Sequence, residues 1–215
     1  MIPLIGVPTL TRHDLCDRML ASIDYPVQDL IVVDNKPDSW EPVKPELVER
    51  LHHVRLPQNL GVAGSWNLII KTSPFSSTWC IVNDDIVFEP GALAEMAQHL
   101  RSDALQFFAI QPLWAAFAIG ENVVSKVGLF SELFHPAYFE DNDYERRVHA
   151  HDLDIEIVTG AKVRHDNSST LQSGFDIQNH KTFKTNSETF RAREAGDVLT
   201  GGEWDLFLRR ELTWD

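Results

Sequence analysis

Length, composition and charge limit what this chain can be. It has 215 residues, 43% of them hydrophobic and 24% charged, which is enough for one globular domain with a sizeable core. Its 19 basic residues stand against 32 acidic residues, a formal net charge of −13. This argues against nucleic acid as a partner, because phosphate binding requires clustered Lys and Arg. An anionic substrate would need a metal ion to offset the repulsion.

Cysteine usage and hydropathy bear on the compartment. Cys16 and Cys80 lie within apolar segments and lack the spacing of a zinc site or a disulfide framework, so we expect reduced, buried thiols. The opening residues, MIPLIGVP, are too short and too interrupted by proline for a signal peptide. No stretch approaches the roughly 20 apolar residues of a membrane helix. We therefore expect a soluble, cytoplasmic protein.

The first half of the chain alternates short β-branched runs with amphipathic segments. This pattern predicts βαβ units and an α/β fold, with a mostly parallel central sheet flanked by helices in a Rossmann-like arrangement. The expected strands cover residues 2–8, 29–35, 53–58 and 79–84. One expected helix has Thr11 as its N-cap, and a second follows a Pro-rich connection and ends near His52. Two more helices are expected over 63–72 and 92–100.

The second half is less regular. Residues 107–119 and 123–130 have the composition of strands. An aromatic loop from His135 leads into a helix that ends near His151. Two short strands over 154–158 and 161–166 and a helix over about 179–195 complete the expected elements.

Polar residues gather where the predicted strands end, at Asp34–Asn35, at Asn59 and at Asn83–Asp84–Asp85. In open α/β sheets, ligands bind beyond the carboxyl ends of the strands. Two carboxylates at a strand end suit Mg²⁺ or Mn²⁺, which prefer oxygen ligands. A solvated turn or a helix N-cap would also explain the trio, although the apolar pattern resumes at Ile86–Phe88 and fits a surface turn poorly.

Three other segments leave a choice between chemistry and structure. The glycines of Gln58–Asn67 allow a ligand to approach the backbone before a helix N-terminus, or they form an ordinary turn. A carboxylate packed among the aromatic residues of Phe139–Arg147 could act as a general base, or the acids could complement the helix dipole. His165 closes a short strand, where it could complete a metal shell or be structural.

In this order, the segments resemble those of family-2-type glycosyltransferases of the glycosyltransferase-A (GT-A) fold, particularly the rhamnosyltransferase-like branch. IPLIGVPTLTR and VVDN are similar to the family's first two strands, and NLGVAGSWN to its Asn-x-Gly-x-Ala-Gly-x-x-Asn loop. VNDDIVFEPGAL resembles its variant DxD motif, FEDNDYERR its Glu-Asp segment, and VRHDNSST its His-x-x-Ser strand. NSETFRAREAG is similar to a last segment but lacks the family's Lys-Trp pair. The resemblance covers Ile2 to about Gly196.

The resemblance implies a metal-dependent, inverting transferase that moves a hexosyl or deoxyhexosyl group from a UDP-, dTDP- or GDP-sugar to an acceptor hydroxyl. It implies Asp141 as catalytic base, and Asp85 and His165 as ligands of Mn²⁺ or Mg²⁺. The residues that it assigns to the donor are Pro8, Thr9, Arg12, Asp34, Asn35, Asn59, Gly61, Asn67, Asn83, Asp84 and Arg193.

The resemblance also implies one GT-A domain over residues 1–215. Its parts would be a nucleotide-binding half over about 1–90, an acceptor and catalytic half over about 91–170, and a C-terminal helical segment over about 171–215. The acceptor, a glycan, a lipid-linked sugar or a protein hydroxyl, would contact Leu113–Asn122 and the tail after Ser168. Two alternatives stay open, a sugar-phosphate nucleotidyltransferase and an inactive nucleotide-sugar-binding protein, the latter because Asn83 replaces the first acid of the DxD motif.

Overall fold

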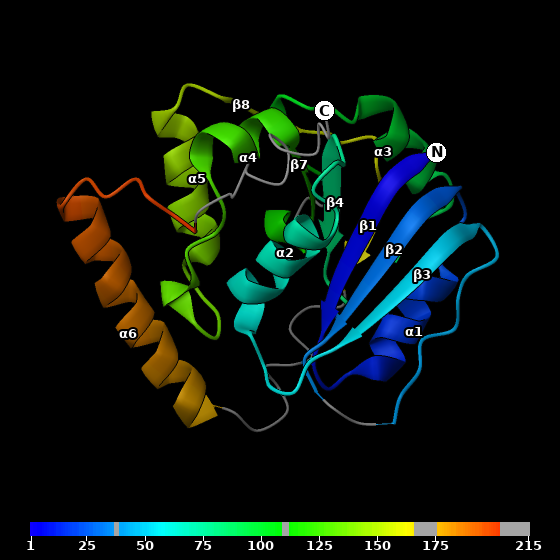
Figure 1. Cartoon of the computed structure of the whole chain (residues 1–215), viewed down its shortest axis with the longest axis horizontal. Coiled ribbons are helices and arrows are strands. Elements are labelled where there is room, and N and C mark those ends of the chain that lie inside the picture. The colour runs from blue at the N-terminus through cyan, green and yellow to red at the C-terminus, as the bar shows by residue number, and fades with distance from the viewer. Residues whose placement is uncertain (37–38, 109–111, 166–175, 203–215) are drawn as a thin grey trace, which may run out of the picture.

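The structure, a computed structural model, describes residues 1–36, 39–108, 112–165 and 176–202. A seven-stranded sheet in the order β3-β2-β1-β4-β7-β6-β8 forms its centre (Figure 1). Its strands are β1 Ile2–Thr9, β2 Val27–Asp34, β3 Val48–Arg55, β4 Thr78–Val82, β6 Ala104–Phe107, β7 Ala116–Gly120 and β8 Asp154–Ile157. All neighbouring pairs are parallel except those that β7 makes with β4 and β6. The predicted mostly parallel α/β sheet is therefore confirmed.

A second, two-stranded sheet consists of β5 Ile86–Phe88 and β9 Val163–His165, which run antiparallel. The apolar run that resumes after the Asn-Asp-Asp trio is thus a separate strand. Ile86 lies opposite His165 in the register, so this pairing brings the end of the trio beside the histidine.

Helices cover both faces of the large sheet. Cys16, Met19 and Leu93 pack in the core on the face of α1 (His13–Ala21) and α3 (Ala92–His99). Trp66 and Tyr144 pack in the core on the opposite face, with α2, α4 and α5. The remaining helical elements are α2 Gly61–Thr72, α4 Glu121–Val127, α5 Glu140–Ala150, α6 Asp176–Ala195 and the short 3-10 turns η1 Leu113–Ala115 and η2 Glu132–Phe134.

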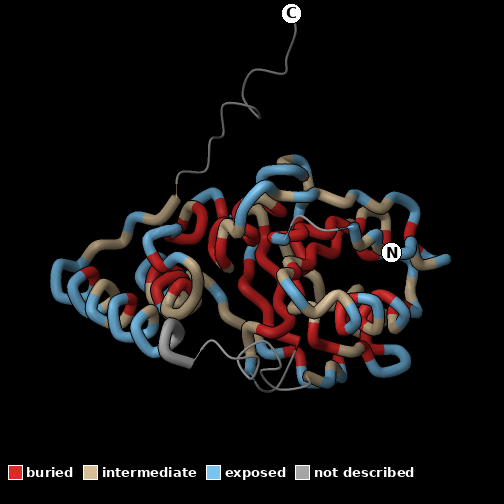
Figure 2. The backbone as a smooth tube through the Cα atoms, turned by 90° about the horizontal axis from the view of Figure 1, so that it is seen from below, coloured by how far each residue is buried: buried red, intermediate tan, exposed pale blue. Residues whose placement is uncertain are grey.

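The sheet itself is the most deeply buried part of the molecule, and α6 lies outermost, beside α5 (Figures 1 and 2). None of the helices in the described part of the chain has the length and hydropathy needed to cross a bilayer.

The prediction of a helix that ends near His52 is wrong, because the strand β3 occupies this region. Val48, Leu51 and Val54 are spaced by three, which suggests a helix, but the segment pairs in parallel with β2 over its whole length. Backbone pairing to the neighbouring strand therefore outweighs the local pattern. As an edge strand, β3 needs few buried side chains, and of its residues only Val48 is fully buried.

Two predicted strands of the second half differ as well. The segment expected as a strand over 123–130 is largely α4, whose buried Val123, Val124 and Val127 have the spacing of one helix face. The long strand expected over 107–119 is divided between the end of β6, η1 and β7. The predicted cap also shifts: Arg12, not Thr11, occupies the N-cap position of α1 and makes no side-chain cap bond.

Candidate active site at the carboxyl edge of the sheet

The carboxyl ends of β1, β2 and β4 lie together because the three strands are adjacent and parallel. The Thr9 hydroxyl at the end of β1 donates a hydrogen bond of 2.7 Å to Asp84 Oδ2. Pro8 precedes Thr9 in β1 and pairs with Val33. The structure thus joins two of the predicted donor residues, Thr9 and Asp84, across 75 residues of sequence.

Burial changes the acidity of Asp84. It raises the pKa of this carboxyl to about 7, although the hydrogen bond from Thr9 opposes the rise. The neighbouring charge of Asp85 raises it further. Asp84 therefore ionises less readily than an exposed aspartate, and its Oδ2 already accepts the hydrogen bond of Thr9.

Asn35, the next residue after β2, is buried in a structural role. Its amide Nδ2 donates to Ser65 Oγ at 2.9 Å, and its Oδ1 accepts from the Leu60 backbone at 3.0 Å. Its backbone N–H donates to Thr9 O at 2.9 Å. Asn35 therefore ties the ends of β1 and β2 to the start of α2.

Asp34 ends β2 with its side chain fully buried beneath two histidines. His13 Nε2 lies 3.3 Å from its Oδ1, and His53 Nε2 lies 3.5 Å from its Oδ2. The Lys36 backbone N–H donates to Oδ1 at 3.0 Å, while Oδ2 has no hydrogen-bond partner among the described residues. The Trp40 ring stacks on His13 with centroids 4.2 Å apart. The sequence analysis missed these two histidines and Trp40, because no spacing along the chain relates them to Asp34.

Asp85 and His165 form a close, nearly buried pair. Asp85 Oδ1 lies 3.0 Å from His165 Nε2, and the side chains are 8% and 7% exposed. Despite this distance, Oδ1 has no hydrogen-bond partner in the described part of the chain. These two atoms form an ion pair when the imidazole is protonated, and their separation also allows both to contact one cation when it is neutral.

The protein part of such a metal site is small. Within residues 1–36, 39–108, 112–165 and 176–202, no group of three or more His, Cys, Asp or Glu could hold a metal ion. Asp85 and His165 fit a cation that takes its other ligands from substrate oxygens and water, as Mg²⁺ commonly does.

Two further predicted residues lie near this pair. Asn83 is half-buried, and its backbone N–H donates to Ala115 O at 2.9 Å. Arg12 forms a two-pronged ion pair with Asp14. The pKa of Arg12 is raised, chiefly by that hydrogen bond and to a smaller degree by the charges of Asp84 and Asp85. Arg12 therefore places a cation within electrostatic range of the acidic trio.

The loop before α2 contacts the turn that leads to α5. His135 Nε2 lies 3.2 Å from Asn59 O, and the Val62 N–H donates to Pro136 O at 2.8 Å. Gly61 has φ +73°, and a Cβ at this position would lie 2.6 Å from Pro136 O. The close approach that glycine permits is therefore an approach of the chain to itself. The contact also brings the turn before α5 beside the start of α2, the helix that follows the carboxyl end of β3.

The first turn of α5 holds two carboxyls in different surroundings. Glu140 is 6% exposed, its Oε2 has no hydrogen-bond partner among the described residues, and burial raises its pKa to about 8. Burial also raises the pKa of Asp141, against the effect of a 2.8 Å hydrogen bond from the Asn142 backbone to Oδ1. Asp141, less buried than Glu140, is the carboxylate of this turn that can reach a ligand with its basicity increased.

Asp143 and Arg193 form a structural ion cluster. Asp143 is fully buried and accepts hydrogen bonds from Arg147 Nε at 2.9 Å and Arg193 Nε at 2.8 Å. Arg193, predicted to contact the donor, thus uses its guanidinium to join α6 to α5. Asn67 has a comparable position in α2, where its amide exchanges hydrogen bonds with the backbone of Phe130 at 2.9 and 3.1 Å.

The expected acceptor loop over Leu113–Asn122 is a wrong prediction for most of its length. Ala116–Gly120 is β7, a fully buried strand between β4 and β6. Its apolar sequence makes it part of the core, so it has no surface to offer an acceptor.

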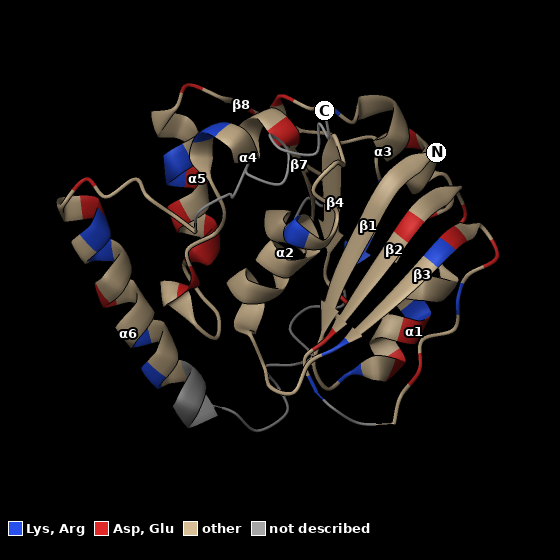
Figure 3. Ribbon diagram, in the orientation of Figure 1, with Lys and Arg blue, Asp and Glu red and all other residues tan. Residues whose placement is uncertain are grey.

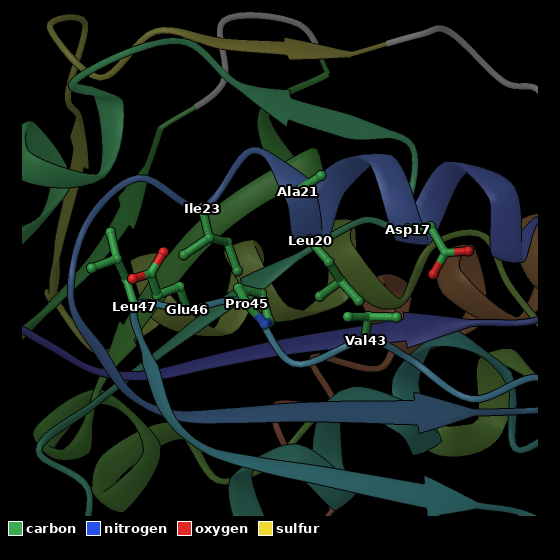
Figure 4. Close-up of a pocket in the computed structure, with 8 residues that line it drawn as sticks. All are labelled: Asp17, Leu20, Ala21, Ile23, Val43, Pro45, Glu46 and Leu47. Carbon is green, nitrogen blue, oxygen red and sulfur yellow. The ribbon is translucent and has the colours of Figure 1, made fainter.

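A separate pocket of about 480 Å³ lies between α1 and the segment before β3 (Figure 4). Leu20, Ile23 and Val43 give it an apolar lining, with Asp17 and Glu46 at its sides. None of the residues predicted for catalysis or donor binding lines it.

The architecture matches solved structures of TarS from S. aureus. Superposition on TarS 1–349 gives a TM-score of 0.51 at 14% identity, over 73% of this chain and 58% of that chain. Full TarS gives 0.53 at 15% identity, over 74% and 35%. TarS 1–349 in complex with UDP-GlcNAc gives 0.56 at 13% identity, over 80% and 61%. This chain therefore shares with TarS a mostly parallel α/β sheet flanked by helices.

These likenesses extend to the fold alone. No protein-family model matches the sequence, and a comparison with curated proteins gives no match either. The chain spans less than two thirds of the length of each TarS structure. The neighbours support the glycosyltransferase fold and lend no support to the rhamnosyltransferase-like branch.

Proposed function

We propose that this protein is a glycosyltransferase that moves a sugar from a nucleoside diphosphate sugar to an acceptor hydroxyl with inversion. The observation that carries the proposal is the Asp85–His165 pair, whose buried Oδ1 lacks a hydrogen bond at the carboxyl edge of a GT-A-like sheet. Solved TarS structures with this fold are complexes with UDP and with UDP-GlcNAc. A UDP-sugar is accordingly the first donor to test.

Asp85 and His165 would hold a divalent cation, Mn²⁺ or Mg²⁺. When bound, such a cation stabilises the negative charge of a leaving diphosphate. Thr9 and Asp84, already hydrogen-bonded to each other, would contact the donor beside it. Asp34 would act in nucleobase binding by positioning His13 and His53, which cover it, and Arg12 would offset the charge of the phosphates.

Asp141 would act as the general base. Its raised pKa makes the carboxylate a better proton acceptor than an exposed aspartate. It takes the proton of the acceptor hydroxyl as that oxygen attacks the anomeric carbon from the face opposite the diphosphate. The carboxylate charge also favours the positive charge that develops on the sugar ring.

The test is an assay of nucleotide products with a matched pair of variants. Wild-type protein is incubated with UDP-, dTDP- and GDP-sugars, Mn²⁺ and a mixture of acceptor glycosides. Asp141→Asn is compared with Asp152→Asn, which removes an exposed acid just beyond the other end of the same helix. We expect nucleoside diphosphate release by the wild type, a loss of about 100-fold or more in Asp141→Asn, unchanged donor affinity, and near wild-type activity in Asp152→Asn.

Other outcomes would contradict the proposal in distinguishable ways. Release of pyrophosphate would identify a nucleotidyltransferase. Donor binding without any product would identify a binding protein. Full activity of Asp141→Asn would remove only the role of Asp141 as base, and Mn²⁺ affinity unchanged by Asp85→Asn would remove only the metal site.

A further inference from the structure

Four aromatic rings form a cluster where α6 packs against the turn that leads into α5. The Phe183 ring centroid lies 5.5 Å from that of Tyr138 and 5.0 Å from that of Phe139. Phe139 also stacks on Phe190, with centroids 5.6 Å apart and planes 26° apart. We call these four residues the α6 aromatic cluster.

The cluster is open to solvent. Phe183 is 51% exposed, and the other three rings are half-buried. A phenylalanine ring left in water forgoes part of the stabilisation that its burial would give, and exposed apolar surface of this kind often marks a binding site. The outer side of α6 is otherwise exposed (Figure 2) and has charges of both signs along its length (Figure 3).

The cluster is held rigidly. Asn186, buried on α6, donates hydrogen bonds to Phe134 O at 2.9 Å and Ala137 O at 2.7 Å. Tyr138 and Phe139 both have positive φ, at 79° and 74°. This backbone region is unfavourable for aromatic residues and is maintained only where the surroundings enforce it. The turn therefore presents its two rings in a preorganised arrangement.

The cluster lies next to the proposed base. Phe139 and Asp141 are two residues apart, so their Cα atoms are separated by at most about 7.6 Å. A molecule that rests on Phe139 and Phe183 consequently reaches the first turn of α5. The cluster therefore adjoins the helix turn that carries Asp141.

We infer that the α6 aromatic cluster is the acceptor subsite and that it binds a pyranose ring of a glycan by stacking against Phe183. The inference rests on the proposed function and adds the chemical class of the acceptor. The C–H bonds of a sugar face are weakly positive, and the face of an aromatic ring is negative, so the two attract. The exposed His180, three residues before Phe183 on the same face of α6, offers a ring N–H to sugar hydroxyls.

An acyl chain fits this surface poorly. Of the four rings, Phe183 alone is exposed, and its described neighbours on the same face of α6, such as His180 and Ser187, are polar. A lipid tail would require a continuous apolar path. A compact ring with one apolar face and polar edges matches the surface better.

The test compares Phe183→Ala and Phe183→Trp with the control Phe75→Ala. Phe75 is 63% exposed in the turn before β4, at the opposite edge of the sheet from the candidate site. Binding of each purified full-length protein to an array of mono- and oligosaccharides is measured without donor. Transfer to methyl glycosides is then measured with the donor that the wild type accepts.

We expect wild type and Phe75→Ala to bind the same glycans. Phe183→Ala should bind them at least tenfold more weakly and raise the acceptor KM by a similar factor, with donor KM and donor hydrolysis unchanged. Phe183→Trp should retain binding.

Equal glycan binding by wild type and Phe183→Ala, or no binding to any glycan of the array, would overturn the inference. So would a change of oligomeric state in Phe183→Ala, because the ring would then be a contact between copies of the chain. If the wild type binds glycans through Phe183 but releases no nucleoside diphosphate from any donor, the proposed function fails and the sugar site remains.

Discussion

Replacing Glu140 with Gln is expected to remove much of the pH dependence of folding stability above pH 5. The side chain is 6% exposed, and its Oε2 has no hydrogen-bond partner among the described residues. Ionisation therefore places a charge in a site that neither hydrates nor pairs it, and the pKa rises from 4.5 to about 8. Gln occupies nearly the same volume and cannot ionise.

The sign of the effect follows from proton binding. Between pH 4.5 and about 8, the folded protein keeps the Glu140 proton that the unfolded chain releases. Stability from this group is therefore complete below pH 4.5 and is lost as the pH rises through about 8. One pKa unit corresponds to about 1.4 kcal/mol, so the shift from 4.5 to about 8 gives a loss on the order of 5 kcal/mol. For a chain of this size, that lowers the melting temperature by roughly 10 °C.

The assay is urea unfolding at pH values from 5 to 8.5 for wild type, Glu140→Gln and the control Glu89→Gln, which removes an exposed carboxylate. Asp141 also has a raised pKa, and its charge contributes to the shift of Glu140, so the difference between the curves of wild type and Glu140→Gln reports Glu140 together with its coupling to Asp141. We expect Glu140→Gln to gain stability over wild type as the pH rises, and Glu89→Gln to follow the wild type. Parallel curves for wild type and Glu140→Gln across this range would refute the reasoning.

Two further predictions concern stability. Arg193→Met should lower the free energy of unfolding by about 3 kcal/mol, because it removes one of the two arginines that hydrogen-bond to the fully buried Asp143. Urea unfolding checks this, and a loss below about 1 kcal/mol would show that Arg147, with Arg146 at 3.8 Å, is sufficient. Gly61→Ala should cost more than Gly91→Ala, since both positions have positive φ but only Gly61 would bring a Cβ onto Pro136 O. Equal melting temperatures for the two alanine variants would contradict the proposed clash.

The parts of the fold that the sequence predicted are those in which local pattern and tertiary environment agree. β1, β2 and β4 are buried in the middle of the sheet, and their continuous apolar runs reflect it. The first part of β3 was predicted as a helix, and α4 was predicted as a strand. Val48, Leu51 and Val54 of the edge strand mimic a helix, and the valines of α4 have strand propensity despite their helical spacing.

The candidate site was predictable where it follows from strand order. Residues after the ends of adjacent parallel strands must meet, and Thr9 and Asp84 do so. The surroundings of Asp34 were not predictable, because His13 comes from α1 and His53 from the edge strand β3, and no spacing along the chain relates either residue to Asp34. Charge alone also could not separate Glu140 from Asp141, since their difference in burial depends on how the turn at Phe139 directs the helix.

Separate parts of the molecule position the proposed base and the proposed metal ligands. Asp85 meets His165 because β5 pairs with β9. Asp141 lies in the first turn of α5. The turn before α5 is hydrogen-bonded to Asn186 of α6, and the buried Asp143 of α5 is paired with Arg193, also of α6. A disturbance of α6 therefore reaches the proton acceptor and the aromatic cluster together, while the pair that would bind the cation keeps its strand contacts. This division makes α6 the element through which acceptor binding and proton removal would be coupled.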